Sequence, residues 1–205
     1  MNIVFYRAPR SSAVPVASVL TELQVPHERI QVDLQKGEQK KPAFLALNPN
    51  GKVPTLVVDG RPMFEAVAMM QWLGERFGVA KKLWPAAEDP ARLDALSWSS
   101  WAYVTLGGAI QRFNFASSEF STKELHHAPS AAYAKTQVFE LFGMLEARLS
   151  KQPFMLGESF SVLDLIVGSM VIWANACGLV GTEQPALNAW VEKLKARPSI
   201  RDEWQ

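Results

Sequence analysis

The sequence is poor in cysteine, since Cys177 is its single cysteine among 205 residues. One cysteine cannot form an intramolecular disulfide, and it cannot supply a cysteine-rich zinc site. An excess of one charge is missing too, because 21 basic residues face 20 acidic residues and the formal net charge is +1. Nucleic-acid binders and proteins held electrostatically on membranes carry basic patches, so neither class is favoured.

Long apolar runs are absent as well. The longest, residues 165–174, is about half of a membrane span, and residues 3–6 are too few for the apolar region of a secretory signal. His126 and His127 lie in a polar stretch with no third ligand nearby, so no metal site is expected. The composition, 48% hydrophobic and 20% charged, is that of an ordinary globular protein. We therefore expect a cytoplasmic protein that binds no metal, nucleic acid or membrane.

The pattern of the sequence changes near residue 80. Before it, short β-rich runs alternate with helical patterns, in the order βαβαββα. Strands are predicted at 2–6, 28–32, 55–58 and 62–64, and helices at 13–23, 42–47 and 66–77. The helix between the first two strands makes them parallel, and Asp59-Gly60 predicts an antiparallel hairpin of the last two. A small mixed sheet with helices on its faces follows.

After residue 80 the pattern is helical almost to the end. We assign residues 81–90 to a linker, because Lys, Pro and Asp gather there, and residues 91–205 to an all-helical domain. One long helix over 91–115, on the order of 38 Å, is predicted, with Gly107-Gly108 weakening its middle. Further helices are predicted around the apolar stripe at 138–149, at 161–176, at 185–196 and after Pro198.

Residues 37–56, GEQKKPAFLALNPNGKVPTL, resemble the corresponding segment of the cytosolic glutathione transferase family, most closely its phi-type version. Residues 64–66, Phe-Glu-Ala, are similar to the family's Glu-Ser signature at the start of the third helix. Gly157 followed by residues 161–164 resembles the N-capping box of the buried sixth helix. These motifs occur in the family's order and spacing over the whole chain. The resemblance implies a thioredoxin-like domain at 1–80, glutathione as co-substrate, and a homodimer.

Glutathione carries a thiol that must become a thiolate before it attacks an electrophile. The resemblance places Ser11 where serine-type members carry the activating hydroxyl. Aligning Pro15 with the bacterial beta-type pattern puts Ser11 at the position of that class's cysteine, with an ambiguity of one residue, so Ser12 is the alternative. Either serine also suits the N-cap of the helix that follows.

The resemblance assigns contacts to the cysteinyl and γ-glutamyl parts of glutathione. Val53 precedes an implied cis peptide bond to Pro54, and its backbone would pair with the cysteinyl unit as an added strand does. Glu65 would bind the γ-glutamyl ammonium. Ala66 stands where the family usually has Ser, so only its backbone N–H remains for the γ-glutamyl carboxylate. Glu65 is also an ordinary first-turn acid for a helix.

The glycyl carboxylate is assigned to Lys52, together with Gln39 and Lys40. Lysine suits an exposed point-charge contact, although Lys40 and Lys41 also fit a solvated charge run. Tyr103, on the predicted long helix, is a candidate for the wall of the electrophile pocket, since the corresponding helix of the family forms it. Aromatic residues at such spacing are more often core.

The sequence therefore predicts a glutathione S-transferase that conjugates glutathione to small hydrophobic electrophiles, with a role in detoxification. One alternative is a non-catalytic interaction module of the same fold, which Ala66 favours and which Glu65 and Lys52 oppose. Another is a glutathione-dependent reductase or peroxidase. Such chemistry usually needs a cysteine in the first βα loop, which has none, and Cys177 is predicted to be a buried, inert thiol. The electrophile is not identified by the sequence.

Overall fold

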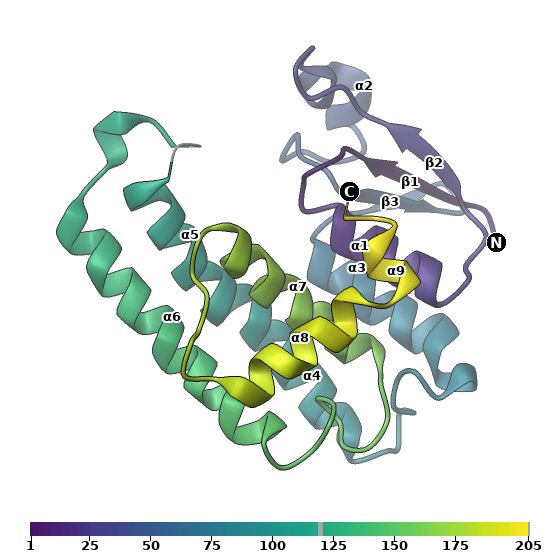
Figure 1. Cartoon of the computed structure of the whole chain (residues 1–205). Helices are drawn as coiled ribbons and strands as arrows, with labels where there is room; N and C mark the ends of the chain where they lie inside the picture. Colours follow the sequence, from purple (N-terminus) through teal and green to yellow (C-terminus); the bar gives the residue numbers. More distant parts are fainter. Residues whose placement is uncertain (119–120, 205) are drawn as a thin grey trace. The chain divides into compact units, whose positions relative to one another are not determined.

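The computed structural model describes residues 1–118 and 121–204 and contains two compact units. One unit comprises Met1–Ala86 with Ala196–Gln205, and the other comprises Ala87–Lys195 (Figure 1). The sequence placed residues 196–205 in the helical domain, whereas in the structure the described part of this segment, residues 196–204, groups with the first unit. Within the described ranges, no helix is long and apolar enough to cross a membrane.

The first unit is built on a four-stranded mixed sheet with the order β2-β1-β3-β4. The strands are β1 (Ile3–Arg7), β2 (Glu28–Gln31), β3 (Thr55–Val58) and β4 (Arg61–Met63). β1 runs parallel to β2 and antiparallel to β3, and β3 runs antiparallel to β4. Asp59 and Gly60 both have positive φ, 47° and 80°, as a tight hairpin turn requires. The predicted thioredoxin-like arrangement is confirmed.

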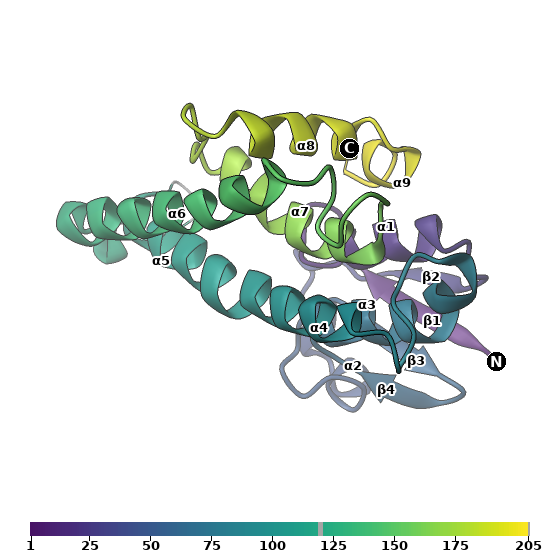
Figure 2. The same cartoon turned by 90° about the horizontal axis from the view of Figure 1, so that it is seen from below.

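Four α-helices belong to this unit: α1 (Val14–Glu22), α2 (Pro42–Leu45), α3 (Ala66–Leu73) and α9 (Pro198–Arg201). α3 continues as a π-helical turn over Gly74–Gly78, so the predicted helix at 66–77 is one rod with a change of pitch. The core of the first unit contains Phe5, Leu20, Leu56 and Met69, none of which is exposed to solvent. Helices α1 and α9 pack against each other, as both views show (Figures 1 and 2).

The second unit is all-helical. Its helices are α4 (Ala91–Trp101), α5 (Gly107–Ser117), α6 (Ala128–Leu149), α7 (Val162–Ala176) and α8 (Pro185–Lys195). A π-helical turn over Ala102–Leu106 joins α4 to α5, so the predicted long helix exists as one rod with a local change of pitch (Figure 2). Gly107 suits this turn, because a Cβ there would lie 3.2 Å from the Ala102 carbonyl oxygen and 3.2 Å from the Met170 sulfur.

Helix α7 is buried along most of its length and begins with the predicted capping box of Ser161 and Asp164. The Asp164 carboxylate accepts hydrogen bonds from the backbone N–H groups of Met155 and Ser161, both at 2.8 Å, and from Trp190 Nε1 at 2.9 Å. Burial raises the pKa of Asp164. This side chain therefore ties the loop before α7, the first turn of α7 and helix α8 together.

Candidate functional site

The topology gathers the predicted site loops at one edge of the sheet. Tyr6 near the end of β1 pairs with Thr55 at the start of β3, and Leu56 pairs with Met63 at the end of β4. Arg7, the last residue of β1, pairs with Gln31, the last residue of β2. The segments that follow β1, precede β3 and follow β4 therefore share this edge. They are residues 8–13, 51–54 and 64–66, and the segment 32–41 that follows β2 starts there too.

The loop between β1 and α1 uses its two serines differently. The Ser11 hydroxyl donates to the Ala8 carbonyl oxygen at 2.7 Å and accepts from the Ala13 N–H at 3.2 Å. The Ser12 hydroxyl instead leaves its own loop and donates to the Val53 carbonyl oxygen at 3.0 Å. Ser11 thus holds the loop together, whereas Ser12 faces the segment predicted to bind the cysteinyl unit.

That segment has the backbone geometry that the resemblance implied. The Val53-Pro54 peptide bond is cis, and Val53 is buried at 6% exposure. Pro54 leads directly into β3, so the carbonyl group of Val53 lies just before a strand of the sheet. The contact between Val53 and Ser12 brings two of the predicted site positions within hydrogen-bonding distance.

Asn48 shapes this segment and was not among the predicted site residues. Its side chain is buried and donates to the Lys52 carbonyl oxygen at 2.7 Å and to Thr55 Oγ1 at 3.1 Å, and it accepts from the Asn50 N–H at 3.0 Å. These contacts close the turn that presents Lys52 and Val53. The sequence signal was the Asn-Pro-Asn-Gly stretch at 48–51, because Asn and Gly favour such side-chain-supported turns.

Glu65 holds a backbone conformation that is unusual for a residue with a side chain. Its φ is 71° and its ψ is 110°, at the N-cap of α3. Strained residues of this kind cost on the order of 1–3 kcal/mol and cluster at binding sites. Glu65 is exposed, while the following Ala66 is 6% exposed and is the first residue of α3.

The predicted glycyl-carboxylate residues lie on neighbouring segments. Lys40 Nζ lies 3.4 Å from the Asn50 carbonyl oxygen, beside the turn that leads to Lys52. Gln39 donates to the Leu34 carbonyl oxygen at 3.3 Å, and its buried Oε1 accepts no hydrogen bond within the described part of the chain. Lys41 pairs with Glu38 at 3.4 Å, as expected for a solvated charge run. Gln39 and Lys40 thus lie on the segment beside the turn that leads to Lys52.

Two other predicted residues belong to the helical unit. The Tyr103 hydroxyl lies 3.4 Å from Ser169 Oγ on α7, and burial raises the pKa of this phenol. Cys177 is half-buried, its thiol lies 3.9 Å from Asn114 Oδ1, and burial raises its pKa. Tyr103 therefore contacts its own unit's interior through its hydroxyl. Among residues 1–118 and 121–204, no three His, Cys, Asp or Glu side chains are grouped to hold a metal ion.

Comparison with known families matches both units. The family model described as "Glutathione S-transferase, N-terminal domain" matches residues 12–76, and the model for the "Glutathione S-transferase, C-terminal domain" matches residues 109–193. Among curated proteins, glutathione S-transferase GstB of Escherichia coli (strain K12) is 32% identical over 189 residues, which cover 91% of this chain and 89% of the relative. The disulfide-bond oxidoreductase YfcG of the same strain is 30% identical over 210 residues, with 96% and 92% covered.

Solved structures show the same similarity in three dimensions. The theta class glutathione S-transferase of Xanthomonas axonopodis pv. citri, solved with glutathione bound, superposes with a TM-score of 0.85 at 28% identity and covers 99% of this chain and 97% of that one. The glutathione transferase URE2P6 of Phanerochaete chrysosporium, in complex with oxidized glutathione, has a TM-score of 0.87 at 26% identity, with 99% and 94% covered.

Proposed function

Because the chain belongs to the glutathione S-transferase family, we propose that it binds glutathione at this edge of the sheet and transfers the thiolate to small hydrophobic electrophiles. The observation that carries the proposal is the hydrogen bond from Ser12 to the Val53 carbonyl oxygen beside the cis bond to Pro54. It places a hydroxyl donor next to the backbone on which the cysteinyl unit would pair.

The contacts of the two serines favour Ser12 as the residue that activates the thiol. Ser11 has a single hydroxyl proton, which it already donates to Ala8, and its oxygen already accepts from Ala13. When the cysteinyl unit pairs with Val53 as an added strand, its backbone N–H competes with Ser12 for the Val53 carbonyl oxygen. The Ser12 hydroxyl is then released beside the sulfur of the same cysteinyl unit. Ser11 serves its own loop; the N-cap of α1 is Ala13, which makes no side-chain capping bond, so the prediction of a serine N-cap is wrong.

The size of this effect suits a thiolate mechanism. A hydrogen bond to a charged acceptor contributes about 1.5–3 kcal/mol. Because one pKa unit corresponds to about 1.36 kcal/mol, a hydroxyl that donates to the thiolate lowers the thiol pKa by about one to two units. Starting from an ordinary cysteine pKa of about 8.5, that decrease means that a substantial fraction of the thiol is ionised at neutral pH.

The charges at the edge complement those of glutathione. Glu65 and Lys52 are exposed, and neither has an ion-pair partner in the described part of the chain. We propose that Glu65 binds the γ-glutamyl ammonium, and that Lys52, with Gln39 and Lys40, binds the glycyl carboxylate. The Ala66 N–H, at the positive end of α3, is left for the γ-glutamyl carboxylate.

The decisive experiment is the pH–rate profile of conjugation to an aryl halide. Ser12→Ala is expected to raise the pKa of bound glutathione and to lower the rate at neutral pH by about tenfold, since each 1.36 kcal/mol is one decade. The affinity for glutathione should stay within a few-fold, because the hydroxyl acts on the anion and not on the rest of the ligand. Ser11→Ala is the comparison variant: it removes two hydrogen bonds of the loop but not the proposed donor, so it should lose about 1 kcal/mol of stability and move the profile much less than Ser12→Ala does.

A shifted profile in Ser11→Ala with an unchanged profile in Ser12→Ala would identify Ser11 as the residue that activates the thiol. An unmoved profile in both variants would assign the activation to another group, with Tyr6 the first to test and Tyr103 of the helical unit the second. Absence of any turnover in the wild type, with glutathione still bound, would favour the non-catalytic module.

A reductase is the second candidate, and the similarity to a disulfide-bond oxidoreductase favours it. The loop at 8–13 has no cysteine, and burial raises the pKa of Cys177, so little of that thiol is ionised at neutral pH. We therefore expect slow glutathione-dependent reduction of a mixed disulfide, unchanged in Cys177→Ala. Turnover faster than aryl halide conjugation would make reduction the main activity.

We also propose that the protein acts as a cytoplasmic homodimer in detoxification, as the family resemblance implies. Light scattering of the purified protein tests the homodimer, and a mass of one chain would contradict it. Localisation of a tagged full-length protein tests the cytoplasmic location.

A further inference from the structure

A buried carboxylate outside the predicted site is connected to the loop that carries Ser12. Glu203, in the segment that packs with the first unit, is 8% exposed. Its Oε2 accepts from Arg7 Nη1 at 2.7 Å, and its Oε1 pairs with Arg29 Nη2 at 2.7 Å and accepts from Thr21 Oγ1 at 2.9 Å. One side chain therefore contacts β1, β2 and α1.

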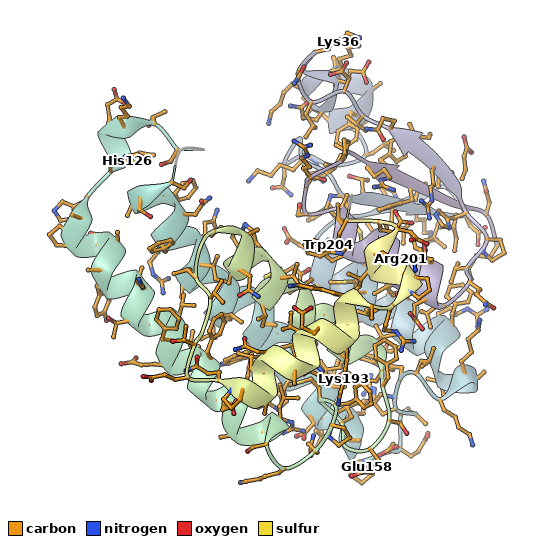
Figure 3. The ribbon with its side chains drawn as sticks, viewed as in Figure 1. Lys36, His126, Glu158, Lys193, Arg201 and Trp204 are labelled. Carbon is orange, nitrogen blue, oxygen red and sulfur yellow. The ribbon has the colours of Figure 1, made fainter. Side chains whose placement is uncertain are left out.

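The segment that carries Glu203 is anchored independently of it. Glu22 of α1 accepts hydrogen bonds from Arg197 Nε at 3.2 Å and from Ser199 Oγ at 2.6 Å. Trp204, labelled in Figure 3, donates from Nε1 to Ser18 Oγ at 3.3 Å. Loss of the Glu203 carboxylate should therefore leave α9 in place, so that the contact to Arg7 can be tested separately from the docking of the segment.

Arg7 is the last residue of β1, and the loop with the two serines begins immediately after it. Its side chain is 16% exposed, and its Nε is buried with no hydrogen-bond partner in the described part of the chain. The guanidinium thus depends on Glu203 for its charge compensation. The next residue is Ala8, whose carbonyl oxygen holds the Ser11 hydroxyl, and Ser12 follows.

From these contacts we propose that Glu203 is a positioning residue for glutathione activation, acting through Arg7 to hold the β1–α1 loop where Ser12 meets the sulfur. An uncompensated, partly buried guanidinium is unfavourable, so without the carboxylate the Arg7 side chain moves toward water and shifts the end of β1. A displacement of about 1 Å at a donor is enough to weaken its effect on the reacting atom. The inference rests on the proposed function.

The test measures the pKa of bound glutathione, by the ultraviolet absorbance of the thiolate, together with kcat and KM for aryl halide conjugation. Glu203→Gln keeps the side-chain volume and removes the charge. It is expected to raise the thiol pKa and to lower kcat at neutral pH by about three- to tenfold, since a tenfold loss corresponds to one pKa unit. The rate should recover at higher pH, and KM for glutathione should change less than about twofold.

Three further variants separate positioning from stability. Glu22→Gln loosens the same segment without touching Arg7, so it should lower the unfolding temperature and leave the thiol pKa unchanged. Asp202→Asn alters an exposed neighbouring acid and should change neither. Glu203→Asp keeps the charge on a shorter side chain, and it should shift the thiol pKa in the same direction by less, which provides a folded variant if the glutamine substitution does not fold.

The outcomes distinguish this inference from the function on which it rests. A wild-type protein that does not lower the thiol pKa would refute both. A wild type that does, with an unchanged pKa in Glu203→Gln and Glu203→Asp, would refute the positioning by Glu203 alone. An equal pKa shift in Glu22→Gln would also overturn it, because docking of the segment in general would then be the cause.

Discussion

Asp164→Ala is expected to be among the most destabilising single changes in the helical unit. The substitution removes the acceptor of three N–H groups, those of Met155, Ser161 and Trp190 Nε1, and of the Ser161 hydroxyl at 2.9 Å. Each hydrogen bond to a charged acceptor contributes about 1.5–3 kcal/mol, while burying the carboxylate costs several kcal/mol in return. The raised pKa of Asp164 is the sign of that cost.

The balance favours a loss of about 3–5 kcal/mol of unfolding free energy, because the donors stay buried without an acceptor. For a chain of this size, about 1 kcal/mol moves the unfolding temperature by about 2–4 °C, so a decrease of about 10 °C is expected. Thermal melts and urea titrations followed by circular dichroism measure both quantities.

The matched control is Asp94→Ala in the same unit. Asp94 is an exposed acid whose carboxylate pairs with Arg148 Nη2 at 2.6 Å, and an exposed pair of this kind contributes about 0–1 kcal/mol. If both variants unfold at the same temperature and urea concentration, the hydrogen-bonded network around Asp164 does not stabilise the unit, and the reasoning fails.

Two further predictions concern ligand binding and pH. Glu65→Ala and Lys52→Ala should each weaken glutathione binding by about 1–3 kcal/mol in calorimetric titrations, because each variant loses a contact to a charged group of the ligand. Ala66→Ser should leave the affinity unchanged or raise it. Unchanged affinity in both alanine variants would contradict the proposed site. Burial tends to raise the pKa values of Glu22 and Glu203, but their arginine and hydroxyl partners outweigh it and hold both below the usual 4.5. Their stabilisation is therefore present above about pH 4.5 and lost as the pH falls through the folded values, so the stability difference between wild type and Glu203→Gln should shrink in acid, and a growing difference would contradict this.

Much of the fold could be predicted because its signals are local. Asp59-Gly60 predicts a hairpin from the backbone preferences of two adjacent residues, and the parallel pair β1 and β2 follows from the helix between them. The π-helical turn at Ala102–Leu106 was not predicted. It changes the pitch without interrupting the apolar periodicity, so the sequence pattern of one long helix conceals it.

The site residues were predicted from motifs, so only positions inside or next to a motif could be named. Residues 37–56 indicated Lys52, Val53 and Pro54, because turn-forming residues in this segment fix the local backbone. The choice between Ser11 and Ser12 could not be made from the sequence, since both are small hydroxyl residues before a helix. It depends on whether the hydroxyl bonds within its own loop, as Ser11 does with Ala8, or across 41 positions of sequence, as Ser12 does with Val53.

The connection between Glu203 and Arg7 shows why such contacts escape sequence reasoning. The two residues are 196 positions apart, and nothing in either local pattern distinguishes this acid from its exposed neighbour Asp202. The difference arises only when α9 packs on α1, because Glu203 is then buried against Arg7 at the end of β1 while the carboxylate of Asp202 stays exposed. A buried charge needs a partner and an exposed one does not, so the fold selects which acid can hold the loop that follows β1.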